Sequence, residues 1–152
     1  KENQEKNIRK IKRGLREKMT RREAREELFK WIFQTEIQGN SVEEAFEHSF
    51  LREEIEKDEV SKVFLERYRK GMVEHQEEVA EKIEAAMTDW DLPRIGYVEK
   101  SLLKIAVYEI YFEDLPVEII VNEAVEIAKI YGDVKTHEFI NGVLAKVIKM
   151  KK

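Results

Sequence analysis

The spacing of apolar residues is the feature that most limits how this chain can fold. Along most of the sequence, large apolar side chains recur at intervals of three or four residues, which is the repeat of one face of an α-helix. No stretch shows the apolar–polar alternation of a half-buried β-strand. Only two prolines and six glycines interrupt the 152 residues. The sequence therefore predicts an all-α fold, a compact bundle of about six or seven helices.

Capping signals indicate where several of these helices begin and end. Residues 20–23, Thr-Arg-Arg-Glu, form a capping box that opens the first firm helix, and Gly39-Asn40 ends that helix. Residues 41–44 form a second capping box, which opens a helix that runs toward Phe50. Further helices are expected over residues 58–90, 95–112, 116–131 and about 137–147.

Three glycines at or inside these segments need an explanation. Gly71 is expected to mark either a break in the third helix or a close crossing with another helix. Gly132 follows the cleanest amphipathic stripe, so we expect it to form a left-handed C-terminal cap. Asn141-Gly142 lies inside a helical pattern, where glycine costs about 1 kcal/mol relative to alanine. Close packing of another helix against Gly142, with Asn141 bonded to a buried neighbour, is the explanation we favour.

The charge is distributed unevenly along the chain. The formal net charge is −4, yet residues 1–25 hold eleven Lys/Arg against four Glu, a local charge of +7, which leaves −11 for the rest. A basic end on an acidic body indicates a local anionic partner, and nucleic-acid phosphate is the usual one. The alternative is a solvated basic tail. We treat residues 1–18 as an extension of uncertain order.

Motifs for enzyme chemistry are absent from the sequence. The glycines form neither a phosphate loop nor a dinucleotide fingerprint, and no serine lies in a nucleophile elbow. No histidine follows a glutamate at the spacing of a helical metal site, and the chain has no cysteine. We therefore expect no catalytic residue, no metal and no cofactor. No run of 18 apolar residues occurs, so we expect a cytoplasmic protein without membrane contacts.

Three arginines at the start of the first helix are the strongest candidate for a binding site. Arg21 and Arg25 are one turn apart and Arg22 is adjacent, where the helix dipole also favours an anion. Guanidinium groups bind phosphate in bidentate fashion, so we expect these side chains to be exposed and to bind RNA. Phe29 and Phe33 follow along the flank, either as core residues or as rings that stack on unpaired bases.

The sequence from residue 92 onward resembles the NusB family of bacterial antitermination factors. The residues that carry the resemblance are Leu-Pro-Arg-Ile-Gly-Tyr-Val-Glu-Lys (92–100), LLKIAVYEI (102–110), Asp-Leu-Pro-Val (114–117), Asn-Glu-Ala-Val-Glu-Ile-Ala-Lys (122–129) and His-Glu-Phe-Ile-Asn-Gly-Val-Leu (137–144). At the front, residues 21–25 resemble the arginine-rich opening of that family. The resemblance spans about residues 20–148.

This resemblance implies a fold, a function and a set of site residues. It implies two helical subdomains packed together, about 19–90 and 91–152. It also implies binding to the boxA element of ribosomal RNA transcripts as single-stranded RNA, together with the ribosomal protein NusE, in an antitermination complex with RNA polymerase. Transferred by position, the RNA-binding residues are Arg21, Arg22, Arg25, Lys135, His137 and Phe139. Phe33 and Glu99 are expected to face NusE.

Some features depart from the family pattern and leave alternatives open. Residues 1–18 have no counterpart in the usual short lead-in, and Lys135 and Glu138 reverse the charges common beside the Thr-His pair. A lone histidine such as His137 is more often a helix cap or a structural hydrogen-bonding group than a ligand. Two other functions remain possible: the RNA-binding module of an RNA methyltransferase, or a structural protein that forms homodimers and whose arginines are incidental.

Overall fold

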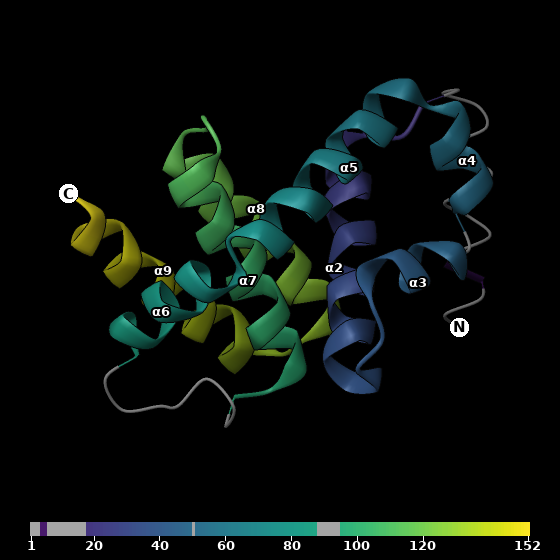
Figure 1. Cartoon of the computed structure of the whole chain (residues 1–152). Helices are drawn as coiled ribbons and strands as arrows, with labels where there is room; N and C mark the ends of the chain where they lie inside the picture. Colours follow the sequence, from purple (N-terminus) through teal and green to yellow (C-terminus); the bar gives the residue numbers. More distant parts are fainter. Residues whose placement is uncertain (1–3, 6–17, 50, 88–94) are drawn as a thin grey trace.

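The computed structural model describes residues 4–5, 18–49, 51–87 and 95–152, and it confirms the all-α prediction. Eight labelled helices and no strand occur within these ranges (Figure 1). Most of the basic extension, residues 1–18, lies outside the described residues. The helices are α2 (Arg21–Gln38), α3 (Val42–Glu47), α4 (Arg52–Lys57), α5 (Glu59–Glu74), α6 (Gln76–Ala86), α7 (Tyr97–Phe112), α8 (Val117–Tyr131) and α9 (Val134–Lys151).

The first helix has the predicted ends. The Thr20 side chain accepts a hydrogen bond from the Glu23 N–H, and the Glu23 side chain accepts one from the Thr20 N–H, which completes the capping box. Helix α2 ends at Gly39, whose φ of 72° lies in the left-handed region that glycine tolerates. Ser41 caps α3 by accepting a hydrogen bond from the Glu44 N–H at 3.1 Å. Helix α3 ends at Glu47, and Phe50 lies outside the described residues.

The prediction of a single long helix over residues 58–90 is wrong. The segment divides at His75 into α5 and α6, and the short helix α4, which the sequence did not predict, precedes it. The His75 ring stacks on Phe112 of α7, with ring centroids 3.8 Å apart, so a contact outside the segment accompanies the break. At Gly71 the predicted close crossing is confirmed, because a Cβ there would lie 2.1 Å from the Tyr108 Oη.

Two other predictions about glycines are also wrong. Gly132 has φ −119° and ψ −159°, which is an extended and not a left-handed conformation. A Cβ on Gly132 would lie 2.6 Å from the Thr136 side chain, so a close approach and not a cap explains this glycine. Gly142 is exposed, and a Cβ there would meet no atom of the described residues within 4 Å, so none of the eight helices packs against it. Asn141 is exposed as well.

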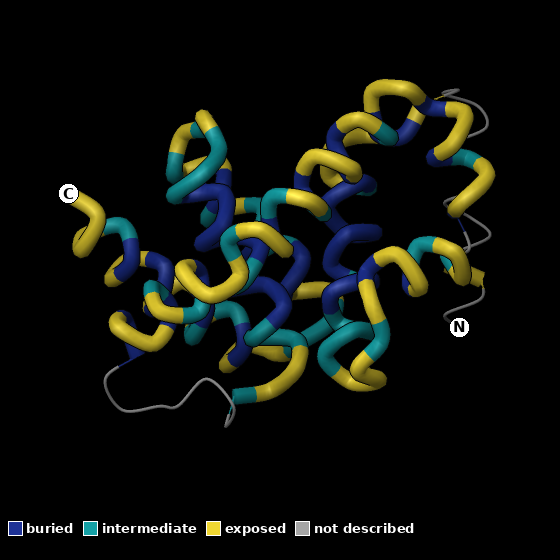
Figure 2. The backbone as a smooth tube through the Cα atoms, in the orientation of Figure 1, coloured by how far each residue is buried: buried dark blue, intermediate teal, exposed yellow. Residues whose placement is uncertain are grey.

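Helix α7 lies at the centre of the bundle. It packs against α2, α5, α6, α8 and α9, and most of its length is buried (Figure 2). The buried apolar side chains form one continuous core that extends from Met19 to Val147. Helix α6 packs on α7 and α9 although it precedes residue 90, and the division into subdomains 19–90 and 91–152 stays a prediction. No helix in the described ranges has the length and apolar character required to cross a membrane.

The start of α5 gives a prediction about the pH dependence of stability. The Asp58 carboxylate accepts hydrogen bonds from the Met19 N–H at 2.8 Å and from the Ser61 hydroxyl at 3.0 Å, and it caps α5. Burial acts to raise the pKa of Asp58, but these hydrogen bonds outweigh burial and hold the pKa below its usual value. The unfolded chain then binds the proton more tightly, so the carboxylate stabilises the fold above the unfolded pKa of about 3.9 and loses this effect as the pH falls further.

We therefore expect Asp58→Ala to lower the free energy of unfolding by about 1 kcal/mol at neutral pH, the usual contribution of a helix N-cap. The difference between wild type and variant should stay constant above about pH 5 and shrink below about pH 4. Urea unfolding of wild type and variant at a series of pH values measures the change in the free energy of unfolding and its dependence on pH. A difference that grows toward low pH would contradict the assigned role of this carboxylate.

Candidate nucleic-acid interface

Arg21 begins α2 and remains exposed, as the sequence predicts. Its guanidinium lies over the Phe64 ring of α5, 4.1 Å from the ring centroid. A guanidinium that stacks on a ring keeps its N–H groups directed outward in the plane of the group, where they can still bind phosphate. The capping box of Thr20 fixes the helix start that carries this residue. Among the described residues, no acidic side chain pairs with Arg21 and competes for its donors.

Arg22 is exposed but paired. Its Nε donates to the Glu123 carboxylate of α8 at 2.8 Å, and its side chain keeps 51% of its surface accessible. An exposed pair of this kind contributes little to stability, and the other guanidinium nitrogens remain open to solvent. Arg22 can therefore bind a phosphate while Glu123 orients it.

The expectation that Arg25 is exposed is wrong. The residue retains only 4% of its accessible surface, and its Nε and Nη2 donate to the Glu109 carboxylate of α7 at 3.2 and 2.9 Å. Glu123 adds a second carboxylate 4.0 Å from Nη1. A buried guanidinium requires such partners, because an unpaired charge in the interior is strongly unfavourable. The structure therefore encloses the innermost of the three arginines between α2, α7 and α8.

Glu109 and Tyr68 complete this buried cluster, and the sequence analysis missed both. The Tyr68 hydroxyl donates to the same Glu109 oxygen at 2.6 Å. Burial raises the pKa of Tyr68, and the Glu109 carboxylate raises it further. Burial lowers the pKa of Arg25, but the neighbouring Glu109 outweighs that effect, so the pKa lies above its ordinary value. A signal was present in the sequence: Glu109 is an acidic residue inside the apolar run 105–112.

The three candidates at the start of α9 occupy one and a half turns. Lys135 is exposed, while His137 and Phe139 are half-buried. Asp133 caps the helix by accepting a hydrogen bond from the Thr136 N–H at 2.9 Å, so His137 is not the cap. These residues are linked to α2 through α8, since the Tyr131 hydroxyl donates to Glu26 of α2 at 2.6 Å.

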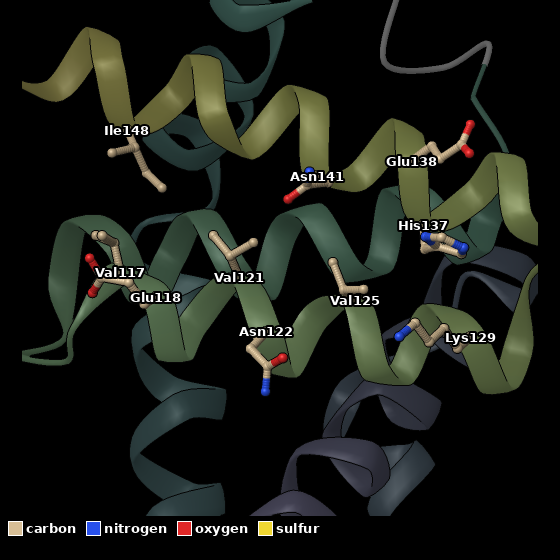
Figure 3. A pocket seen from close by; sticks show the side chains of 10 residues that line it. All are labelled: Val117, Glu118, Val121, Asn122, Val125, Lys129, His137, Glu138, Asn141 and Ile148. Carbon is tan, nitrogen blue, oxygen red and sulfur yellow. The ribbon is translucent and has the colours of Figure 1, made fainter.

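His137 faces a groove between α8 and α9 (Figure 3). The groove has a volume of about 590 Å³, with an apolar floor and polar groups along its sides. Lys129 lies across from His137 at one end, and Ile148 lies at the other. The residues that line it are Val117, Glu118, Val121, Asn122, Val125, Lys129, His137, Glu138, Asn141 and Ile148.

Phe33 and Glu99 lie where α2 approaches the start of α7. The Phe33 ring is 6.4 Å from the ring of Tyr97, which begins the turn that carries Glu99. Both candidates are half-buried, whereas Tyr97 keeps 48% of its surface exposed. Glu36 of α2 pairs with Lys100 at 3.9 Å and also with Lys104, which ties the two helices together. An exposed aromatic ring surrounded by charged residues is typical of a protein–protein contact. Tyr97 was not among the residues predicted from the sequence.

Phe29 belongs to the core, which settles one of the two alternatives for that ring. It is 2% exposed and packs on Tyr131, with ring centroids 4.9 Å apart. Within the described part of the chain, no group of three His, Asp or Glu side chains is arranged to hold a metal ion.

A family model, sequence relatives and solved structures of NusB all match this chain. The model of the NusB family matches residues 22–149. The transcription antitermination protein NusB of Bacillus subtilis (strain 168) is 38% identical over 130 residues, which cover 85% of this chain and 95% of that protein. The solved structure of T. maritima NusB has a TM-score of 0.76 and 33% identity, and the match covers 87% of this chain and 92% of that one.

A crystal structure of the antitermination factors NusB and NusE in complex with double-stranded RNA also matches. The TM-score is 0.74 at 25% identity, and the match covers 86% of this chain and 96% of that one. Both the sequence and the arrangement of helices are therefore shared over almost all of the described bundle. The chain belongs to the NusB family.

Proposed function

We propose that this protein is a non-catalytic RNA-binding factor that promotes transcription antitermination by binding the boxA element of ribosomal RNA transcripts together with NusE. The observation that carries the proposal is the match to a NusB–NusE complex that contains RNA, which extends over 86% of this chain. The B. subtilis relative, matched over 95% of its own length, is named as an antitermination protein, which favours this function over a methyltransferase module. The complex with RNA polymerase and a cytoplasmic location belong to the same proposal.

In this proposal RNA lies over the exposed start of α2 and the start of α9. Arg21 and Arg22 contact phosphates, and Lys135 adds a third cation. His137 and Phe139 contribute to the same surface. Arg25 does not need to reach the RNA, because its guanidinium donates to Glu109 and thereby holds α2 in position. Phe33 and Glu99, with Tyr97 beside them, form the surface for NusE.

We expect the double variant Arg21→Ala/Arg22→Ala to bind boxA-like RNA more weakly and with a reduced dependence on salt. Each phosphate contact on a single strand contributes about −0.7 to the slope of log K against log salt concentration, so the loss of two contacts should make the slope less steep by about 1.4. Fluorescence anisotropy titrations across a series of salt concentrations give both quantities. Single-stranded and double-stranded forms of the RNA should be compared, because the solved complex contains double-stranded RNA.

The matched control is Arg52→Ala/Lys70→Ala, which removes the same charge from exposed positions on α4 and α5. It should leave the slope unchanged. Adding NusE should increase RNA affinity in the wild type, and Phe33→Ala/Glu99→Lys should abolish only this increase. Failure of the wild type to bind either form of RNA, with or without NusE, would reject the proposed function.

A further inference from the structure

Exposed lysines lie along one face of α9, on both sides of a glycine that leaves the helix backbone uncovered. Lys135, Gly142, Lys146 and Lys149 are spaced by seven, four and three residues, which places them on one face of a helix. All four are exposed. From Lys135 to Lys149 the row extends for about 21 Å at a rise of about 1.5 Å per residue. We call these four residues the α9 stripe.

The charge of this region is opposite to that of the body. Residues 134–152 contain five lysines and a single acidic residue, Glu138, whereas the whole chain has a formal charge of −4. None of the three lysine side chains of the stripe forms an ion pair with a residue in the described ranges. By contrast, Arg22 and Arg25 are paired with Glu123 and Glu109. Lys135 interacts electrostatically with Asp133, whereas Lys146 and Lys149 offer charges that no acidic residue in the described ranges neutralises.

Gly142 has no structural role that explains it. A glycine inside a helix is unfavourable, and in other settings a close approach of another element justifies it, as Tyr108 does at Gly71. At Gly142 a Cβ would meet nothing within 4 Å. Glycine is also used where a ligand approaches the backbone closely, and this use fits an exposed position between unpaired lysines.

We propose that the α9 stripe binds the ribose-phosphate backbone of RNA and extends the RNA surface from the start of α9 toward its C-terminal end. The inference rests on the proposed function, because Lys135 belongs to both surfaces. Phosphates contact Lys146 and Lys149, and the strand passes close to the helix backbone at Gly142. The polyanion complements the charge of the stripe.

The groove between α8 and α9 shares helix α9 with the stripe and provides room for bases (Figure 3). Its apolar floor, which includes Val121 and Val125, suits the faces of unpaired bases. Asn141 of α9 places its amide group at the side of the groove, where it can hydrogen-bond base edges, and Asn122 of α8 also belongs to the lining. His137 connects the groove to the start of α9. A strand whose phosphates follow the stripe can therefore direct its bases into the groove.

Two variants test the stripe in RNA titrations with the whole chain. Lys146→Glu/Lys149→Glu should weaken RNA binding and make the salt slope less steep by about 1.4, the effect of two lost phosphate contacts. Gly142→Leu should weaken RNA binding several-fold by covering the helix backbone, while the protein stays folded because the position is exposed and its Cβ would meet no described residue within 4 Å. Thermal unfolding of each variant verifies that the fold is kept.

The controls match each change. Arg52→Glu/Lys70→Glu makes the same change in charge at exposed positions on α4 and α5, outside both proposed RNA surfaces. Ala85→Leu adds a bulky apolar side chain at an exposed helical position on α6, outside the stripe. Both controls should bind RNA nearly as the wild type does, because neither changes a residue of a proposed RNA surface.

Three results would overturn the inference. The first is that Lys146→Glu/Lys149→Glu binds RNA as its charge control does, and the second is that Gly142→Leu binds as the wild type does. The third is that Gly142→Leu prevents binding of NusE but not of RNA, which would make the stripe a protein interface. If Arg21→Ala/Arg22→Ala still weakens binding in the same titrations, the proposed function stands and only the stripe is rejected.

Discussion

Replacing Arg25 by alanine is expected to destabilise the protein by about 3–5 kcal/mol, the usual effect of removing one partner of a buried ion pair. The Glu109 carboxylate, 2% exposed, would lose the guanidinium that donates two of its hydrogen bonds and would remain in the interior with Tyr68 as its neighbour. Urea unfolding followed by circular dichroism measures the change. The RNA affinity of the folded protein should change little, because Arg25 does not contact RNA in the proposed function.

Two comparisons separate this interpretation from a general effect of arginine removal. Arg22→Ala removes an exposed pair with Glu123 and should change the free energy of unfolding by less than about 1 kcal/mol. The triple variant Arg25→Met/Glu109→Leu/Tyr68→Phe removes the guanidinium, the buried carboxylate and the phenol hydroxyl together, and it should recover most of the stability that Arg25→Ala loses. If Arg25→Ala and Arg22→Ala lowered the free energy of unfolding equally, the buried pair with Glu109 would stabilise the protein no more than an exposed pair.

Replacing Gly71 by alanine is expected to destabilise the protein by about 1–3 kcal/mol, the usual effect of forcing extra volume into a packed site. The new methyl group would overlap the side chain of Tyr108. Tyr108 is 3% exposed, and its hydroxyl donates a hydrogen bond to Glu113 at 2.8 Å. The gain in helix propensity from glycine to alanine opposes this loss but does not cancel the overlap. Thermal and urea unfolding give the net effect.

Gly142→Ala is the matched control, because it makes the same change inside another helix. Nothing lies within 4 Å of the new methyl group, so only the helix propensity changes. We expect this variant to be more stable than the wild type by up to about 1 kcal/mol. If both substitutions changed stability in the same direction, the packing assigned to Gly71 would be wrong.

Most of the features that the sequence predicted depend on neighbouring residues, and most of those that it missed depend on distant ones, although the extended conformation of Gly132 is a local exception. The capping box at Thr20 was predicted correctly, because both partners lie within four residues. Arg25 was expected to be exposed, because its partner Glu109 is 84 positions away and no local pattern joins them. The break at His75 was missed for the same reason, since the stacked Phe112 belongs to another helix.

The glycines show this limit most directly. Gly71 and Gly142 both interrupt an apolar helical pattern, and their local sequences do not distinguish a tight crossing from open space. Only the arrangement of the helices places Tyr108 against the first and leaves the second bare. The candidate binding residues divide in the same way. Their position at helix starts was predictable, but whether each charge is free or already paired was not.

The central position of α7 has a consequence for how the protein unfolds. Five other helices, α2, α5, α6, α8 and α9, rest on it, so none of them can detach without opening a face of α7 to water. Partial opening therefore gains little chain freedom for the apolar area it exposes. We expect the amides of α2 and α7 to exchange with solvent only when the whole chain opens, as a single cooperative unit.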